Sequence, residues 1–193
     1  MRYTPKHRVE ARGRIILAAA GAIRAQGLTE PSVSDIMARA GLTHGAFYHH
    51  FTDRDALVAE AVAAAAAQTS ERVFADDADR ASMVGTYCSL SHADASGEGC
   101  VLAALGTEAA HSDSKSVRAV FATSARGFLR HVARILRSAG RGRDTSNPDS
   151  LHTVDEIDDE ALSLASRMVG AVILARLVDD RRLAGRILEV ARR

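Results

Sequence analysis

Residues 32–54 constrain the fold of this chain more than any other segment, because two short helical patterns stand there with only a glycine-containing turn between them. Ser32 and Asp35 have the spacing of a capping pair at a helix start. Gly41 can end that helix in a backbone conformation with positive φ. The helix between them would bury one stripe of apolar residues, Val33, Ile36, Met37 and Ala40. The segment therefore predicts a helix over about 33–40, a tight turn and a second short helix.

The second helix, which Thr43 can cap, has an apolar stripe of only two residues, Phe47 and Phe51, one turn apart. Its other side chains are small or hydrogen-bonding and include no carboxylate: His44, Gly45, Ala46, Tyr48 and His49. A short helix with two aromatic anchors and an acid-free outer face suits insertion into the groove of a polyanion. The pattern is that of a helix-turn-helix, and it predicts duplex DNA as the ligand.

These residues resemble the N-terminal pattern of the TetR (tetracycline-repressor) family of bacterial transcriptional regulators. The family pattern runs from a first helix ending in Gln-Gly, through Ile-Ala-x-x-Ala-Gly-Val, to Tyr-x-His-Phe and a basic residue. The resemblance spans about residues 12–62 and is carried by Gln26-Gly27, Ile36, Ala40-Gly41, Phe47-Tyr48, His50-Phe51, Arg54 and Leu57. Leu28 and Met37 depart from the pattern inside the head, and His44 and His49 depart from it on the reading face.

The resemblance implies a role for each residue of the reading helix. Contacts to phosphates, which position the protein on DNA, are expected from Thr43, Tyr48, His50 and Arg54. Contacts to base edges are expected from His44, Gly45, Ala46 and His49. Phe47 and Phe51 are expected in the core. A helix-turn-helix DNA-binding domain is expected over residues 1–55, and a helical ligand-binding and dimerisation domain over 56–193.

Composition indicates an all-α fold. Hydrophobic residues make up 47% of the chain, aromatic residues only 4%, and there are three prolines and no tryptophan. We expect about nine helices: three in the head, a fourth starting near Asp53-Arg54, and five more at about 79–93, 100–111, 115–138, 155–178 and 180–192. Residues 1–8 read as a flexible arm and 140–150 as an exposed loop, with Thr153 and Glu156 as a capping box after it.

The charge of the chain is uneven, although its net value is only +1. Residues 1–24 contain one acid, Glu10, and six basic residues: Arg2, Lys6, Arg8, Arg12, Arg14 and Arg24. Beside the helix-turn-helix, this basic end indicates a local DNA-facing surface. The alternative is an ordinary solvated helix start.

The location expected from the sequence is cytoplasmic, with no membrane partner. The N-terminus has no apolar core of a signal peptide. The most apolar run, 168–178, contains Arg176 and is too short to span a bilayer. Two cysteines without metal-ligand spacing fit a reducing compartment.

The same run, 168–178, is apolar on nearly every face, and such a helix has to be covered on all sides. A second copy of the chain would provide the cover, with close contact allowed at Gly170, Ala171 and Ala175. A further apolar stripe follows at Leu183, Ile187, Val190 and Ala191. The TetR family dimerises through its last two long helices, so both arguments predict a homodimer. The alternative is a helix wholly inside one subunit.

The C-terminal part is expected to bind a small-molecule effector of unknown identity. Residues 99–108 resemble a segment that, in one branch of the family, belongs to the ligand-binding core. Candidate lining residues are Tyr87, Cys88, His92, Cys100, Leu105, Phe121, Phe128 and Met168. For each of them taken singly, plain core is the favoured interpretation. Cys88 and Cys100 could also form a thiol sensor. With no Lys or Arg near them in sequence, we favour two small buried hydrophobic residues.

The sequence thus predicts a ligand-released repressor that binds a palindromic operator as a dimer. An activator, or a partner-regulated DNA-binding protein without an inducer, is the alternative. No motif of a phosphate loop, a nucleophile elbow or a metalloprotease helix occurs, so we expect no enzyme, no catalytic residues and no cofactor. His49 and His50 diverge by about 100° on a helix, so no metal site is expected either. A non-specific architectural DNA binder would not need so large an apolar C-terminal part.

Overall fold

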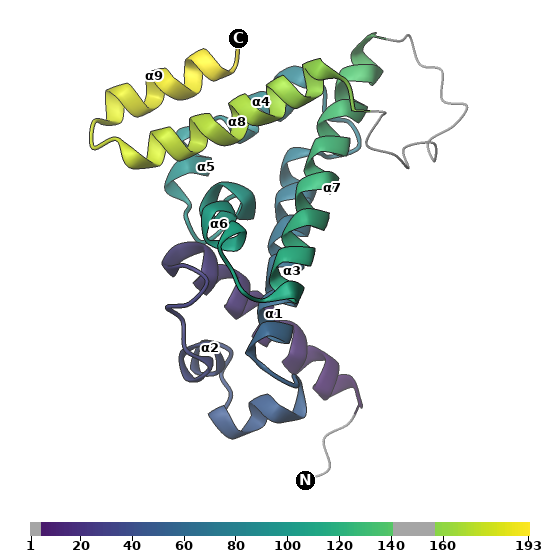
Figure 1. Cartoon of the computed structure of the whole chain (residues 1–193), viewed down its shortest axis with the longest axis vertical. Coiled ribbons are helices and arrows are strands. Elements are labelled where there is room, and N and C mark those ends of the chain that lie inside the picture. The colour runs from purple at the N-terminus through teal and green to yellow at the C-terminus, as the bar shows by residue number, and fades with distance from the viewer. Residues whose placement is uncertain (1–4, 141–156) are drawn as a thin grey trace. The chain divides into compact units, whose positions relative to one another are not determined.

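The computed structural model of this chain describes residues 5–140 and 157–193, and every regular element in these two ranges is helical (Figure 1). The expected all-α fold is therefore confirmed. The elements are α1 (Pro5–Gln26), α2 (Val33–Arg39), the 3₁₀ helix η1 (His44–His49), α3 (Arg54–Val73), α4 (Arg80–Tyr87), α5 (Leu90–Asp94), α6 (Val101–Ala110), α7 (Lys115–Gly140), α8 (Asp159–Leu177) and α9 (Arg181–Ala191).

The structure differs from the sequence expectation at two places. The helix expected over 79–93 is two helices, because Ser89 takes an extended backbone and its Oγ accepts the His92 N–H at 3.1 Å as the N-cap of α5. The arm expected over residues 1–8 is already helical from Pro5, a residue well tolerated in the first turn of a helix. Thr153, Glu156 and the loop expected after Gly140 lie outside the described residues. The N-cap of α8 is Asp158, which accepts the Ala161 N–H at 2.8 Å.

The chain forms two compact units. The first combines residues up to 67 with 96–121, and the second combines 68–95 with 122–193. Helices α3 and α7 contribute residues to both units. The functional boundary expected between residues 55 and 56 stays a prediction.

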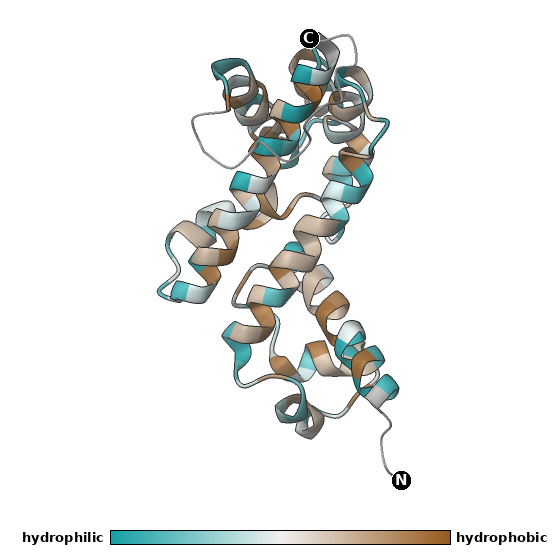
Figure 2. Ribbon diagram, turned by 90° about the vertical axis from the view of Figure 1, so that its right-hand side faces the viewer, coloured by the Kyte–Doolittle hydropathy of each residue, from teal (hydrophilic) through white to brown (hydrophobic). Residues whose placement is uncertain are grey.

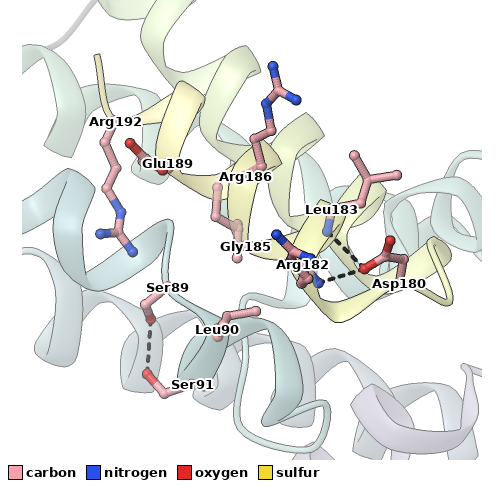
Figure 3. A pocket seen from close by; sticks show the side chains of 11 residues that line it. Ser89, Leu90, Ser91, Asp180, Arg182, Leu183, Gly185, Arg186, Glu189 and Arg192 are labelled. Atoms are coloured by element: carbon pink, nitrogen blue, oxygen red, sulfur yellow. Dashed lines mark hydrogen bonds between the residues drawn. The ribbon is translucent and has the colours of Figure 1, made fainter.

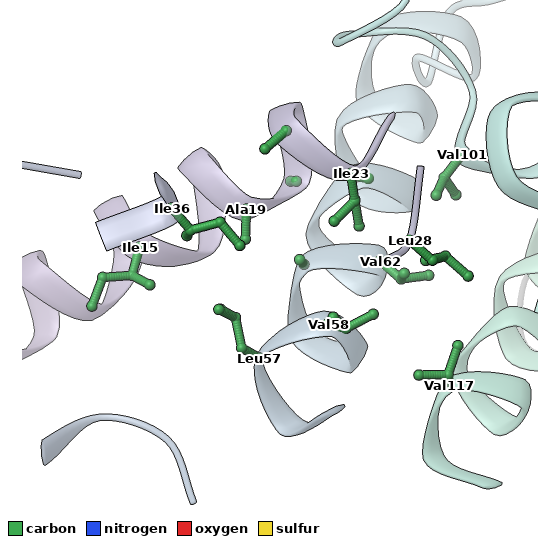
Figure 4. Close-up of a cluster of buried hydrophobic side chains, with 14 of the residues drawn as sticks. Ile15, Ala19, Ile23, Leu28, Ile36, Leu57, Val58, Val62, Val101 and Val117 are labelled. Carbon is green, nitrogen blue, oxygen red and sulfur yellow. The ribbon is translucent and has the colours of Figure 1, made fainter. Parts of the chain in front are cut away.

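The core of the first unit is built on α1. Figure 4 shows Ile15, Ala19 and Ile23 of α1 among apolar side chains from α2, α3, α6 and α7. All three α1 residues are completely buried. The partners drawn with them are Leu28, Ile36, Leu57, Val58, Val62, Val101 and Val117. Residues of α6 and of the start of α7 therefore share one core with the helix-turn-helix.

Polar contacts also join the end of α1 to α6. Gly27 ends α1 with φ +103°, and the next N–H, that of Leu28, donates to the Glu108 carboxylate at 2.7 Å. The buried Arg24 donates to the Gly99 carbonyl at 3.2 Å. Both ends of the segment 99–108 therefore bind the C-terminal end of α1.

In the second unit α8 and α9 pack against each other, and arginines connect them to the short helices. Arg176 donates to the Ala93 carbonyl at 3.0 Å, and Arg192 donates to the Cys88 carbonyl at 2.8 Å. Arg181 forms an exposed ion pair with Asp94. The bonds from Arg176 and Arg192 satisfy backbone carbonyl groups at the C-terminal ends of α5 and α4, which a helix cannot satisfy internally.

No helix in the described ranges is long and apolar enough to cross a membrane. Figure 2 shows hydrophilic residues interrupting the apolar ones along the helices. Arg167 and Arg176 interrupt the apolar residues of α8 in this way.

We predict that Gly27→Ala destabilises the protein, whereas Gly13→Ala does not. An alanine at φ +103° is strained, and its Cβ would lie 3.2 Å from Glu108 Oε2. The expected loss in the free energy of unfolding is about 1–2 kcal/mol. Gly13 lies inside α1 with nothing within 4 Å of an added Cβ, so alanine there should be neutral or stabilising by up to about 1 kcal/mol. Urea denaturation of the two variants measures the difference, and equal midpoints would contradict the role given to Gly27.

Candidate nucleic-acid interface

Local sequence signals fix the start and end of the first helix of the candidate interface. Ser32 Oγ accepts the Asp35 N–H at 3.1 Å, and the Asp35 carboxylate accepts the Ser32 N–H at 3.3 Å. The capping box predicted from the sequence is therefore confirmed. Gly41 has φ +72°, which gives the chain the turn needed after α2.

The second helix, η1, is anchored by aromatic side chains. Phe47 is 2% exposed and Phe51 is 4% exposed, and their rings stack with centroids 5.6 Å apart. Their expected place in the core is confirmed. Thr43 precedes η1 with an extended backbone, but its side chain makes no capping hydrogen bond. Phe47 is the buried residue within η1 itself, so the short helix depends on this anchor.

The residues expected to read DNA lie together on the outer side of η1. His44, Gly45, Tyr48 and His49 are exposed, as is Thr43 before them. Tyr48 keeps 69% of its surface accessible, although its ring packs edge-on against Phe47 at 5.2 Å. Ala46 is half-buried. The arrangement presents imidazole, hydroxyl and methyl groups with no carboxylate among them. Their individual DNA contacts stay predictions.

His50 lies at the edge of a hollow of about 380 Å³ between α1 and the helix-turn-helix. The other lining residues are Arg8, Ala11, Leu42, Ala46 and His49. Burial lowers the pKa of His50, and the nearby charges of Arg8, His49 and Arg12 lower it further. His50 therefore favours the neutral form, which can donate one hydrogen bond but adds no positive charge.

Arg54 is bound to backbone carbonyls of the protein and is not a freely exposed cation. Its Nη2 donates to the Leu28 and Pro31 carbonyls, so the first turn of α3 holds the loop between α1 and α2. The side chain is only half-buried. A phosphate contact from the remaining N–H groups of its fork stays a prediction.

The basic N-terminal end is less available for DNA than its sequence indicates. Arg24 is 6% exposed and binds backbone carbonyls, and Arg12 pairs with Glu60 of α3. Lys6, Arg8 and Arg14 are exposed. Arg8 donates to the His49 carbonyl at the end of η1, at 3.1 Å. Sequence reasoning missed the positional roles of Arg8, Arg12 and Glu60, because no local pattern connects residues that lie about 40 to 50 positions apart.

The expected effector-lining residues are all buried, but they divide between the two units. Cys100, Leu105 and Phe121 belong to the first unit, and Tyr87, Cys88, His92, Phe128 and Met168 belong to the second. Within the second unit, rings form a continuous series. The centroid distances are 4.7 Å for His92–Tyr87, 5.4 Å for Tyr87–Phe128, 5.3 Å for Phe128–Phe74 and 5.0 Å for Phe74–His131. Phe74 and His131 were not identified from the sequence. An effector contact from any of these residues stays a prediction.

Burial raises the pKa of the Cys88 thiol to about 11, and the charges of Arg192 and Arg167 offset this only in part. The thiol is therefore protonated at neutral pH. This agrees with the interpretation of Cys88 as a small hydrophobic residue, since the thiolate is the reactive form. Cys100 is also buried, and neither cysteine is in a disulfide.

A larger open groove, of about 1090 Å³, lies in the second unit between α5 and α9 (Figure 3). Ser89, Leu90 and Ser91 line one side of it. Arg182 and Arg186 of α9 line it as well, as does Arg192, which directly follows that helix. None of the expected effector residues lines this groove. In the described ranges, no group of three or more His, Cys, Asp or Glu side chains could hold a metal ion.

Comparison with known proteins gives matches of two kinds. Residues 15–61 match the sequence model of the bacterial regulatory proteins of the tetR family. No curated protein matches the sequence significantly.

Solved structures resemble the chain over nearly its whole length. A TetR-family regulator from Cytophaga hutchinsonii has a TM-score of 0.74 at 16% identity, with 99% of this chain and 95% of that chain covered. One from Agrobacterium tumefaciens has a TM-score of 0.72 at 19% identity, with 96% and 97% covered. One from Chloroflexus aurantiacus has a TM-score of 0.64 at 26% identity, with 97% and 92% covered.

We predict that His131 makes the protein less stable in mild acid. Its Nε2 lies 3.2 Å from Ser70 Oγ and its ring stacks on Phe74, and burial lowers its pKa. The folded state therefore keeps His131 neutral while the unfolded chain binds a proton below about pH 6.5. This contribution to stability is present above that pH and is lost as the pH falls through and below it.

The measurement is the melting temperature between pH 7.5 and 5.5. His131→Gln should have a smaller acid-induced drop than the wild type, and His111→Gln, at an exposed histidine of the first unit, should have the wild-type drop. An unchanged pH dependence in His131→Gln would exclude this residue as the cause.

Proposed function

Because the chain belongs to the TetR family of bacterial regulatory proteins, we propose that it is a dimeric repressor that leaves a palindromic operator when a small-molecule effector binds. The coarse function, that of a DNA-binding transcriptional regulator and not an enzyme, follows from the family. The operator, the effector and the direction of regulation are the proposed part.

The observation that supports the DNA-binding role most directly is the exposed, acid-free face of η1 above two buried phenylalanines. We assign base-edge contacts to His44, Gly45, Ala46 and His49. Gly45 is exposed and has no side chain, and no protein atom outside its own helix lies within 4 Å of where its Cβ would be. Its backbone could therefore approach the groove closely. Phosphate contacts are assigned to Thr43, Tyr48, His50 and Arg54, whose hydroxyl, imidazole and guanidinium groups can donate to phosphate oxygens.

Exposed leucines support a dimer through α8 and α9. Leu174 of α8 is 54% exposed and Leu177 is 75% exposed, while Leu183 and Val190 of α9 are 45% and 53% exposed. Large apolar side chains gathered on two adjacent helices favour a protein partner over solvent. A second copy of the chain is the partner that the family implies, and it would place two η1 helices about one helical turn of DNA apart.

An effector would act in the C-terminal part of the chain. The buried aromatic rings around Tyr87 and Phe128 would offer the effector apolar contacts. Release of the protein from DNA requires only that the effector bind more tightly to the state that does not bind DNA. An activator, or a regulator controlled by a protein partner, is the alternative. It is favoured if no small molecule changes operator affinity.

We predict that selection from a random duplex pool enriches a palindrome. Tyr48→Phe should then lose about tenfold in operator affinity, because it removes one hydroxyl donor to phosphate from each subunit and keeps the ring that packs on Phe47. Arg126→Ala, at an exposed residue of the second unit, should bind as the wild type does. Binding that depends steeply on salt but enriches no sequence would contradict a sequence-specific regulator.

We also predict that Leu174→Glu converts the dimer into a monomer. A carboxylate there would be buried without a partner in the proposed interface. The matched control is Leu17→Glu on α1, where the leucine has the same 54% exposure, and it should remain dimeric. Sedimentation velocity at micromolar concentration decides, and a dimeric Leu174→Glu would place the interface elsewhere.

A further inference from the structure

Phe47 is the only buried side chain within η1. It contacts the Phe51 ring, which in turn contacts the charged Arg12 of α1. The Phe47 ring stacks on Phe51 with an angle of 23° between the rings. On Phe51 lies the guanidinium of Arg12, whose Cζ is 4.7 Å from the ring centroid. A cation over an aromatic face at this distance is attracted by the ring.

The guanidinium is itself fixed by α3. Arg12 Nη1 and Nη2 donate to the two carboxylate oxygens of Glu60, one to each. A bidentate pair sets the plane of the guanidinium as well as its position. The hydrogen bonds to Glu60 raise the pKa of Arg12, as expected of a cation held by its partner. Glu60, Arg12, Phe51 and Phe47 thus form one column from α3, across α1, to η1.

We propose that Arg12 and Glu60 are positioning residues for DNA recognition, which hold η1 at the angle it needs in the groove. A six-residue 3₁₀ helix has poor hydrogen-bond geometry of its own, so its orientation has to come from its anchor. The inference rests on the proposed function, since it requires η1 to enter DNA.

The competing reading makes Arg12 one more phosphate contact of the basic N-terminal end. The Arg12 side chain is 37% exposed and that of Glu60 is 40% exposed, so burial alone does not exclude a phosphate contact from Arg12. The two readings predict opposite effects of removing the Glu60 charge. If charge alone matters, losing a carboxylate from a DNA-binding head strengthens binding to the polyanion. If Glu60 positions Arg12, the same change weakens specific binding.

The experiment compares Glu60→Gln, Arg12→Lys and the double variant on the selected operator and on a non-operator duplex, over a range of salt. Both single variants should lose about tenfold in operator affinity. The double variant should lose no more than either single one, because one column is broken in each case. Non-operator affinity and the salt slope should stay at the wild-type values, which a general loss of folded protein would not allow.

Two matched controls fix the scale. Glu30→Gln removes an exposed carboxylate from the same unit, and Arg14→Lys changes an exposed arginine of the same helix. Both should bind the operator as the wild type does.

Stronger or unchanged operator binding by Glu60→Gln would overturn the proposal. So would wild-type binding by Arg12→Lys, because lysine keeps the charge but not the flat bidentate fork. Failure of the wild type to select any operator would refute the proposed function instead, so the two failures are distinguishable.

Discussion

Phe47 and Phe51 carry the apolar packing beneath η1, and the rest of the candidate interface depends on this stacked pair. Since these two buried rings supply the apolar packing of η1, the residues on its exposed side do not have to be apolar. They can be imidazole, glycine, methyl and phenol, which are groups that donate hydrogen bonds or allow close approach. Under the proposed function, this division between an anchored inner side and a polar outer side would let a six-residue helix serve in recognition.

Leu28 anchors the turn that leads into α2, as the two phenylalanines anchor η1. Its N–H is held by Glu108 of α6 and its carbonyl by Arg54 of α3, while its side chain is buried. Two helices, α6 and α3, therefore determine where the chain goes after Gly27. Arg54 therefore holds the backbone of the first unit as well as being a proposed phosphate contact. Tyr48 is a proposed phosphate contact without hydrogen bonds of this kind.

Local signals predicted the head well, because each lies within one turn of helix. The Ser32–Asp35 cap, the ends of α1 and α2 at Gly27 and Gly41, and the Phe47–Phe51 anchor are all of this kind. Contacts between distant positions could not be predicted. Arg12–Glu60, Arg24–Gly99 and Leu28–Glu108 join residues 48, 75 and 80 positions apart, so counting charges overestimated the basic surface. The break between α4 and α5 was missed because the apolar spacing continues across the capping residue Ser89.

The participation of α6 in the first unit has a consequence for how this protein could be rebuilt. Val101, Leu105, Val117 and Phe121 are part of the same core as Ile15 and Leu57. A fragment cut after α3 would therefore expose the apolar surface that these side chains cover. A chimaera that transfers the helix-turn-helix to another protein would have to bring residues 96–121 with it, or supply equivalent apolar cover. The transferable module is discontinuous in the chain.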